Sequence, residues 1–369
     1  MKTMQTSSRK HDHITIVLKQ NVSFRNKKTG FENLEFRHNA LPELNFDEID
    51  TSTTFLGKKI SIPLIISSMT GGYSKAERIN ALLAEICADK GIALGVGSQK
   101  QALENNKYHP SFSVIRKLAP GVAVFGNIGA ADIVNKDISN ILRLIDLIKA
   151  DGFAIHLNPL QELLQPEGNV NFRGVLTAIE KIVQKSPVPI IIKEVGAGIS
   201  GSVAKQLLNT GVRIIDVAGA GGTSWAGVEI LRRNILKKKN KSKNFLSFNC
   251  EKNYLDNFWD WGISTVDALK EVCPLKKTVS DLKIIASGGI SNGIEIAKSI
   301  ALGADYAASA RAILRTLLAD NKSYNKSVKQ TIELINVWEK QLRMVMFLTG
   351  SRTLQDLQNQ KLLVKNPCD

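Results

Sequence analysis

Eight short apolar runs recur along residues 63–308, and most of the intervals between them have the periodicity of amphipathic helices. The helical segments include 75–90, 133–149, 175–185 and 202–210, and the apolar runs are 63–69, 92–96, 122–128, 153–157, 189–194, 213–217, 283–287 and 305–308. Short strands that alternate with helices form parallel sheets with right-handed crossovers. Eight such units predict a closed (β/α)8 barrel of the TIM type. An open doubly wound sheet has similar local patterns and remains the alternative.

The rest of the chain divides around this repeat. We expect an N-terminal arm over residues 1–60, the barrel over 61–350 with a C-terminal helical extension at 321–350, and a tail over 351–369. The segment 232–262 is polar and irregular, and it ends in an aromatic cluster at 258–261. We therefore expect it to be a basic insertion after the sixth strand.

The chain has 49 Lys and Arg against 34 Asp and Glu, a net charge of +15. Such a balance favours anionic partners, which include nucleic acids, acidic lipids and phosphorylated small molecules. The four cysteines are scattered without a CxxC pair, which favours a reducing compartment over a disulfide framework. The N-terminus is polar, and no apolar run is long enough to span a membrane. A soluble, cytoplasmic protein is the expectation.

Residues that directly follow the predicted strands carry most of the candidate chemistry. In a barrel of this kind the active site lies at the carboxyl ends of the strands. Lys193 ends the apolar run of the fifth strand, where a buried ammonium needs a partner. Polar residues follow the fourth strand, and packing alone explains them poorly: His156, Asn158, Gln161 and Glu162. The other strand-end segments are 68–72, 95–100, 126–127, 219–224, 287–290 and 309–311.

The loops after the seventh and eighth strands are the most diagnostic pair. In many barrels these two loops and a helix N-terminus bind a phosphate through backbone N–H groups. Gly288 and Gly289 leave room for phosphate oxygens, and Ser309 and Ala310 are placed to donate from the start of a helix. A site for one phosphate suits flavin mononucleotide (FMN), and no GxGxxG fingerprint opens an early βαβ unit.

Seven phrases, in order along the chain, make it similar to type 2 isopentenyl-diphosphate isomerase over nearly its whole length. They lie at 9–13, 69–72, 97–100, 156–162, 193–196, 221–225 and 261–265. The resemblance implies an FMN-dependent barrel enzyme of isoprenoid biosynthesis. Such an enzyme interconverts isopentenyl diphosphate and dimethylallyl diphosphate by a 1,3-proton shift on reduced FMN with Mg²⁺. It also implies NADPH or NADH as the reductant and a homotetramer or larger assembly, without a nucleic-acid or membrane partner.

The same resemblance assigns roles to individual residues. Gln161 would lie over the substrate hydrocarbon, and Glu162 would bind Mg²⁺. The arm, through Arg9 and Lys10, would close over the diphosphate. The catalytic candidates are Gln161, His156 and Lys193. The substrate-binding set is Arg9, Lys10, Ser98, Gln99, Lys100, Asn158 and Gln161. The flavin set is Ser68, Met69, Thr70, Ser98, Asn127, Lys193, Thr223, Gly288, Gly289, Ile290, Ser309 and Ala310.

Several of these positions keep a second interpretation. His156 is either a polar group of the substrate pocket or a satisfied structural histidine, and His11 and His13 either contact the diphosphate or hold the arm. Trp225 and Trp338 are interpreted as packing residues. Two positions depart from the family's usual residues: Lys100 stands in place of Arg and loses a bidentate fork, and Ala218 stands in place of Ser.

Two other functions agree with part of the sequence. A flavin-dependent 2-hydroxy acid oxidase or dehydrogenase would share the barrel and the glycine pair, but it needs a His base with Arg residues for a carboxylate. The segment 287–290 offers no such phrase. A basic RNA-binding protein agrees with the charge, but aromatic residues are only 6% of the chain and no nucleic-acid motif is recognised.

Overall fold

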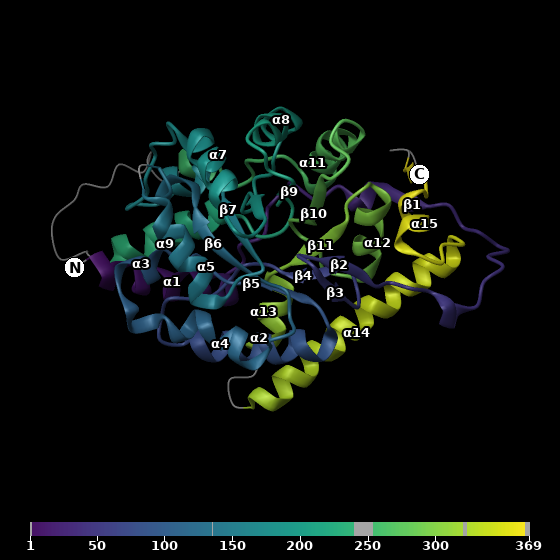
Figure 1. Ribbon diagram of the computed structural model, residues 1–369, viewed down its shortest axis with the longest axis horizontal. Coiled ribbons are helices and arrows are strands. Elements are labelled where there is room, and N and C mark those ends of the chain that lie inside the picture. The colour runs from purple at the N-terminus through teal and green to yellow at the C-terminus, as the bar shows by residue number, and fades with distance from the viewer. Residues whose placement is uncertain (1, 135, 240–253, 320–322, 366–369) are drawn as a thin grey trace.

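The computed structural model describes residues 2–134, 136–239, 254–319 and 323–365, and a closed barrel of parallel strands forms its centre (Figure 1). Each of the eight strands pairs with the next along the chain, and the last pairs with the first. They are β4 (Leu64–Ile66), β5 (Ala93–Gly95), β6 (Val124–Gly129), β7 (Gly152–His156), β8 (Ile190–Lys193), β9 (Ile214–Asp216), β10 (Lys283–Ser287) and β11 (Tyr306–Ser309). Every one overlaps a predicted run, so the (β/α)8 prediction is confirmed.

Helices connect successive strands and cover the outside of the barrel (Figure 1). The four helices predicted from periodicity are present as α2 (Ala76–Lys90), α5 (Ile138–Ile148), α7 (Val175–Lys185) and α8 (Gly201–Asn209). The C-terminal helical extension is the long α14 (Tyr324–Leu348), whose Trp338 is buried as expected. The other helices are α3 (Lys100–Glu104), α4 (Pro110–Leu118), α6 (Pro159–Leu164), α9 (Trp225–Lys239), α11 (Thr265–Val272), η5 (Cys273–Lys277), α12 (Gly293–Ala301) and α13 (Arg311–Leu317), with η3 (Asn106–Tyr108) and η4 (Ala130–Asp132) as short 3₁₀ turns.

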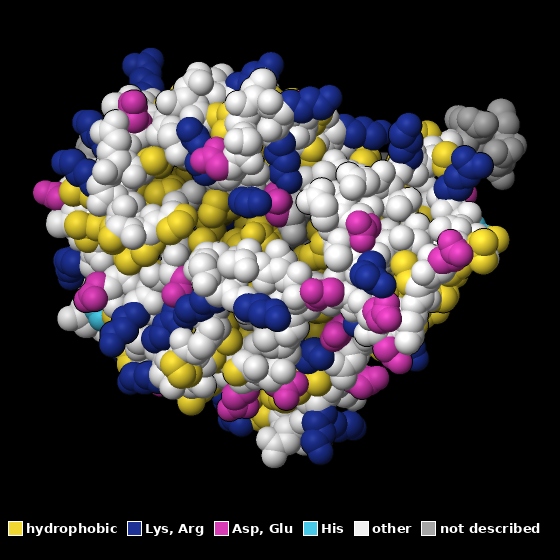
Figure 2. Space-filling view, turned by 45° about the vertical axis from the view of Figure 1, so that its right-hand side comes forward, with side chains coloured by type: hydrophobic (Ala, Val, Ile, Leu, Met, Phe, Trp, Pro, Cys, Tyr) yellow, Lys and Arg dark blue, Asp and Glu magenta, His cyan; other side chains and the backbone are white. Residues whose placement is uncertain are grey.

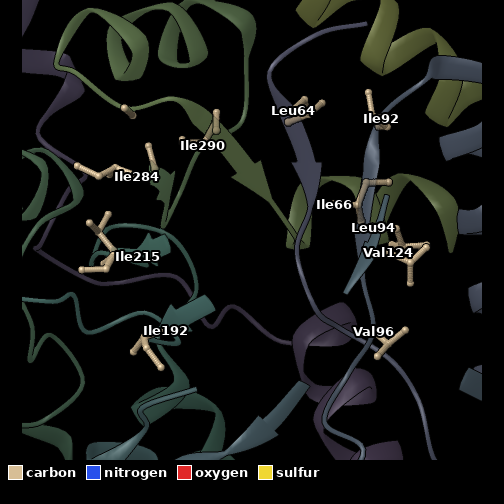
Figure 3. Packing of buried hydrophobic residues seen from close by; sticks show 14 of the residues in the cluster. Leu64, Ile66, Ile92, Leu94, Val96, Val124, Ile192, Ile215, Ile284 and Ile290 are labelled. Atoms are coloured by element: carbon tan, nitrogen blue, oxygen red, sulfur yellow. The ribbon is translucent and has the colours of Figure 1, made fainter. Parts of the chain in front are cut away.

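Side chains along each strand alternate between the two faces of the barrel wall. Outward-facing residues such as Ile192, Ile215 and Ile284 belong to the main core between strands and helices (Figure 3). Their neighbours Ile191 and Ile285 belong to a separate apolar cluster inside the barrel. Successive side chains of a strand point to opposite faces of the sheet. Once one residue is known to point into the barrel, the next must therefore point toward the helices.

A short hairpin supplies aromatic packing for the cluster inside the barrel. It consists of β2 (Thr53–Phe55) and β3 (Lys58–Ile60), joined by Leu56 and Gly57, both at positive φ as tight hairpin turns require. Phe55 packs edge-on against Tyr306, with ring centroids 4.9 Å apart, and the Tyr306 hydroxyl donates to the carbonyl oxygen of Thr54 at 2.6 Å. The hairpin thus closes the end of the barrel opposite the predicted site.

Both segments that flank the barrel, the N-terminal arm and the C-terminal tail, contain regular secondary structure. The arm begins with helix α1 (Lys2–Lys19) and continues through η1 (Phe31–Asn33), β1 (Leu34–Phe36) and η2 (Phe46–Glu48). The tail forms α15 (Leu354–Gln358) and β12 (Leu362–Val364). Strands β1 and β12 pair antiparallel, with Leu34 opposite Val364, so the two segments form a small sheet of their own (Figure 1).

The expectation of an irregular segment over 232–262 is wrong at its start. Helix α9 continues to Lys239, and Arg232 lies buried within it. Apolar periodicity did not reveal this helix because its buried residues mix apolar side chains, such as Val228 and Ile230, with the charged Glu229 and Arg232. At the other end Trp259 is buried, and its indole N–H donates to the carbonyl oxygen of Ser23 at 2.9 Å. Residues 240–253, the centre of the expected insertion, lie outside the described residues.

None of the helices in the described part of the chain is long and apolar enough to cross a membrane.

We predict that Phe55→Ala lowers the free energy of unfolding by about 3–5 kcal/mol. The side chain is 1% exposed and sits between two other aromatic rings, so truncation leaves a cavity inside the barrel. Urea unfolding followed by circular dichroism measures the change. Leu41→Ala, at a side chain that is 73% exposed, is the matched control and should cost less than about 0.5 kcal/mol. Equal effects of the two substitutions would contradict this role of the hairpin.

Candidate active site at the barrel mouth

A cavity of about 470 Å³ opens at the carboxyl ends of the strands. It brings together most of the residues predicted from the sequence, from the arm as well as from all eight strand ends. The predicted residues on its walls are Arg9, Lys10, Ser68, Met69, Ser98, Lys100, Asn127, His156, Asn158, Gln161, Glu162, Lys193, Thr223, Gly288, Gly289, Ile290, Ser309 and Ala310.

Two predicted contacts do not reach this cavity. Thr70 is buried, and its hydroxyl donates to Asn80 Oδ1. Gln99 is fully buried, with Nε2 donating to the carbonyl oxygen of Leu144 at 3.0 Å and Oε1 accepting from the backbone N–H of Asn127 at 3.1 Å. Both side chains fix the strand-end loops from behind, so a contact of Thr70 with the flavin or of Gln99 with the substrate would have to come from the backbone.

Strand alternation places a layer of polar side chains directly above the apolar cluster inside the barrel. Ile191 and Ile214 point inward, so Lys193 and Asp216, two residues later on β8 and β9, point inward as well. In the register of the barrel His156 lies opposite Lys193, and Lys193 lies opposite Asp216. Three neighbouring strands thus place His156, Lys193 and Asp216 side by side at the bottom of the cavity.

Lys193 is held between two acceptors at the bottom of the cavity. Its Nζ donates to the carbonyl oxygen of Glu194 at 2.5 Å and lies 3.7 Å from Asp216 Oδ2. The other carboxylate oxygen, Asp216 Oδ1, accepts from the Ser287 hydroxyl at 2.5 Å and from the backbone N–H of Ala218 at 3.2 Å. Burial raises the pKa of Asp216, and the charge of Lys193 and the hydrogen bond from Ser287 oppose that rise.

Glu194, next along the chain, has a structural role. Its Oε2 accepts the backbone N–H groups of Val195 at 2.6 Å and of Gly196 at 2.7 Å. Burial raises the pKa of this carboxyl to about 7, against the effect of these hydrogen bonds. The carboxylate therefore shapes the loop after β8 on which Lys193 depends.

His156 is a neutral histidine in this site. Its Nδ1 lies 2.9 Å from Asn127 Oδ1, which fits an Nδ1–H donor and leaves Nε2 as an acceptor. Burial lowers the pKa of His156 to about 3, and the charges of Lys193, Lys10, Arg9 and Lys100 add to the effect. Both interpretations of His156 therefore hold in part, because it lines the cavity and also has a fixed partner.

The glycine loops after β9 and β10 pack directly against one another. Gly288 and Gly289 adopt φ values of +107° and +87°, and a Cβ on Gly288 would lie 2.1 Å from the carbonyl oxygen of Gly219. The Thr265 hydroxyl donates to the carbonyl oxygen of Gly288 at 2.6 Å. This contact explains the phrase at 261–265, which supports the glycine loop from behind. Glycine is required here by backbone conformation and packing.

Helix α1 of the arm lies against the cavity through buried polar contacts. Lys10 Nζ donates to the carbonyl oxygens of Gly71 at 2.7 Å and of Ser98 at 2.6 Å, which ties the helix to the loops after β4 and β5. Burial and the neighbouring charge of Arg9 lower the pKa of Lys10 to about 7. His13 Nε2 lies 2.8 Å from Oε1 of the fully buried Glu229 on α9. His13 therefore holds the arm, whereas His11 is exposed.

The polar residues after β7 belong to the same network. Gln161 Nε2 donates to Glu229 Oε1 at 3.3 Å, and Asn158 Nδ2 donates to Gln161 Oε1 at 3.3 Å and to Glu162 Oε1 at 3.0 Å. Burial acts to raise the pKa of Glu229, but the hydrogen bond from His13 and the charge of Arg232 outweigh it and lower the pKa. The orientation of the Gln161 amide is thus fixed by partners on both sides.

Several residues of the cavity wall were not predicted. Trp225, interpreted as a packing residue, lines the cavity and packs edge-on against His13 at 5.3 Å between ring centroids. Asp132 pairs with Lys100 at 2.6 Å across the cavity rim. Asp216 itself was missed, although its place two residues after the inward Ile214 is a signal that the sequence carries. Arg311 opens helix α13 and also lines the cavity.

Curated relatives align with the chain almost end to end. An isopentenyl-diphosphate delta-isomerase of Pelodictyon phaeoclathratiforme is 47% identical over 98% of this chain and 98% of its own length. Another from Chlorobium limicola is 47% identical over 98% and 97%, and one from Pseudescherichia vulneris is 43% identical over 97% and 96%.

This chain belongs to the isopentenyl-diphosphate delta-isomerase family. The family model of FMN-dependent dehydrogenases also matches residues 3–109 and 166–364. Among solved structures, a lactate oxidase of Pediococcus acidilactici has a TM-score of 0.67 at 16% identity, over 99% of this chain and 94% of that one. A mandelate oxidase variant has a TM-score of 0.62 at 12% identity, over 99% and 100%. These last two likenesses support the fold alone.

The walls of the cavity suit the flavin that the family model names. The hydroxyl oxygen of Ser68 and Oδ1 of Asn158 are buried without a hydrogen-bond partner among the described residues. Orphaned buried polar atoms of this kind are costly unless something satisfies them. Their position on the wall of this cavity fits a bound cofactor and substrate.

A metal ion would find only a partial set of protein ligands in this isomerase. No group of three or more His, Cys, Asp or Glu residues within the described ranges is arranged to hold one. Glu162 lines the cavity, and its Oε2 accepts from the backbone N–H of Asn169 at 2.6 Å. A single carboxylate fits Mg²⁺ only where substrate phosphates supply further ligands.

We predict that acid destabilises the wild-type protein more than His156→Gln. The folded state keeps His156 neutral down to about pH 3, whereas an unfolded histidine binds a proton near pH 6.5. Between these values the unfolded state binds more protons, so the free energy of unfolding falls as the pH falls, by at most about 1.4 kcal/mol per pH unit for this group. Urea unfolding at pH 6.5, 5.5 and 4.5 measures the difference.

His38→Gln, at an exposed histidine of the arm, is the matched control and should follow the wild-type curve. Parallel pH dependence in His156→Gln and the wild type would contradict a neutral, buried His156.

Proposed function

We propose that this protein interconverts isopentenyl diphosphate and dimethylallyl diphosphate by a 1,3-proton shift, with bound FMN and Mg²⁺. The observation that carries the proposal is the single cavity at the barrel mouth. One wall has the glycine loops and Lys193, and another has arm cations beside Gln161 and Glu162. Identity of 47% to named isomerases over nearly the full length supports the same reaction.

The chain's cations suit the diphosphate end of the substrate. Arg9, Lys10 and Lys100 line the same part of the cavity as Ser98. Lys100 is paired with Asp132, and Arg9 lies 3.9 Å from Glu167. When a diphosphate binds, its oxygens would replace these carboxylates as the partners of the two cations. We expect the arm helix to close over the diphosphate and to limit the access of water to the reacting carbons.

Other residues of the cavity wall suit the hydrocarbon, and we place the reacting carbons beside them. Gln161 has its amide held between Asn158 and Glu229, and Trp225 presents an aromatic wall. An unactivated alkene is a poor base, so its protonated form needs a surrounding without water and with a fixed electron-rich face. Reduced FMN, when bound, supplies such a face and can carry protons. Lys193 would place positive charge at the edge of that cofactor.

The finer parts of the proposal come from the resemblance. Glu162 would bind Mg²⁺ together with the substrate diphosphate. NADPH or NADH would reduce the flavin, and the protein would work in the cytoplasm as a homotetramer or larger assembly. An absorption spectrum of the purified protein tests the flavin, and an anaerobic isomerase assay with reductant and Mg²⁺ tests the reaction.

A flavin-dependent 2-hydroxy acid oxidase is the second candidate, favoured only by the shared barrel. Its named structural relatives are at most 16% identical among those compared above. The loop after β10 reads Ser287-Gly288-Gly289-Ile290, without the His and Arg that a hydroxy acid would need. Bleaching of the flavin by lactate or mandelate would favour the oxidase. An RNA-binding role has less support, since basic and acidic side chains are interspersed over the face seen in Figure 2.

We predict that Gln161→Ala lowers turnover about a hundredfold while the fold and FMN content persist. The side chain lies at the hydrocarbon end and is oriented by two partners, so its loss disturbs the position of the reacting carbons. Steady-state isomerase kinetics and the flavin spectrum measure the two effects. Gln184→Ala, at an exposed position of α7, is the control. Near-normal turnover in Gln161→Ala would remove Gln161 from the hydrocarbon site.

We predict that Glu162→Gln raises the Mg²⁺ concentration needed for half-maximal turnover by about tenfold or more, because an amide is a weaker ligand than a carboxylate. Flavin binding should be unchanged. Turnover measured against Mg²⁺ concentration gives the shift, and Glu180→Gln on the exposed face of α7 is the control. If Glu162→Gln keeps the wild-type Mg²⁺ dependence, Glu162 is not the metal ligand.

A further inference from the structure

Asp216 is a buried carboxylate that the proposed reaction does not yet use. It is 3% exposed and lies at the carboxyl end of β9, pointing into the barrel. Burying an isolated carboxylate costs several kcal/mol, so such a group persists only with charge or hydrogen-bond partners. The nearest cation is Lys193, directly opposite in the strand register.

The two oxygens of this carboxylate have different surroundings. Oδ1 accepts from the Ser287 hydroxyl at 2.5 Å and from the backbone N–H of Ala218 at 3.2 Å. Oδ2 faces Lys193 Nζ at 3.7 Å. Ala218 stands at φ +38°, an uncommon conformation for a residue with a side chain, and this turn directs its N–H back at Oδ1. One oxygen is therefore anchored by the protein, and the other is presented to the lysine.

Lys193 has other titratable neighbours, and each acts differently. His156 faces it from β7 as a neutral ring, and Glu194 follows it on β8 with a carboxylate occupied by backbone N–H groups. Lys10 reaches the cavity from the arm and adds positive charge. Among these neighbours Asp216 alone combines a negative charge with an oxygen directed at Nζ.

We propose that Asp216 is a positioning residue that holds the Lys193 side chain at the edge of the cofactor, with Ser287 fixing the carboxylate. The positive charge next to the flavin would then come from Lys193 on a barrel strand, and not from the cations of the arm at the cavity rim. The inference rests on the proposed function, since it assigns the cofactor side of the cavity to FMN. Asp216 itself touches neither substrate nor cofactor in this arrangement.

Bound FMN can report on this charge, because its absorption and reduction potential respond to a cation at its edge. Lys193→Met should lower the midpoint potential of the bound flavin, because the reduced ring loses a nearby cation. If Asp216 positions that cation, Asp216→Asn should move the potential toward the value of Lys193→Met. A substitution that only removed a negative charge from the site would raise the potential instead. The absorption spectrum of the reduced flavin, recorded at one fixed pH, should follow the same order of variants.

A double variant separates positioning from a general structural effect. If Asp216 acts through Lys193, Asp216→Asn adds nothing in the Lys193→Met background. Asp281→Asn, an exposed acid before β10 that pairs with Arg213, makes the same charge change away from the mouth and should leave the midpoint potential unchanged. Should Asp216→Asn fail to fold, Ser287→Ala serves instead and should produce a smaller shift in the same direction.

The outcomes are distinguishable. Wild-type protein that takes up no FMN contradicts both the proposed function and this inference. Wild-type protein that binds FMN and isomerises the substrate, while Asp216→Asn keeps or raises the wild-type midpoint potential, contradicts only the inference. An effect of Asp216→Asn that persists undiminished in the Lys193→Met background also overturns it.

Discussion

The two-residue alternation of side chains along the barrel strands is the constraint on which the site depends. Once an apolar residue fills the barrel interior, the next inward position lies one layer closer to the mouth. On β8 and β9 that position is occupied by Lys193 and Asp216, directly above Ile191 and Ile214. A shift of either strand by one residue would bury these charges among the helices and destroy the site. The packing of the core and the chemistry of the mouth are therefore set by the same register.

The polar layer is stable because most of its members are paired across elements. Ser287 and Lys193 satisfy Asp216, Asn127 satisfies His156, and the arm reaches in to pair His13 with Glu229. Such networks gain rigidity only when nearly every group has a partner. Among the buried polar atoms without a partner in the described residues, Ser68 Oγ and Asn158 Oδ1 lie on the cavity wall, where a cofactor or substrate would complete them.

Much of this architecture was predictable from the sequence, for identifiable reasons. Each barrel strand is short and apolar on both faces, so its signal does not depend on distant contacts, and the strand-end rule then located the mouth. The rule could not tell which side chains in a loop face inward. Gln99 and Ser98 are adjacent, yet Gln99 points back to the carbonyl of Leu144 while Ser98 lines the cavity. Helix α9 was missed because the charged Glu229 and Arg232 are buried on it beside Val228 and Ile230, which interrupts the apolar periodicity.

The comparison with lactate and mandelate oxidases shows how little the barrel itself decides. The fold is shared at 16% identity or less, so it does not by itself fix the reaction. What distinguishes this chain is the set of groups around its own cavity: a neutral His156 held by Asn127, a Gln161 amide held between two partners, and cations carried by the arm helix. These groups agree with the proposed binding of a diphosphate and with a proton shift that involves no net oxidation.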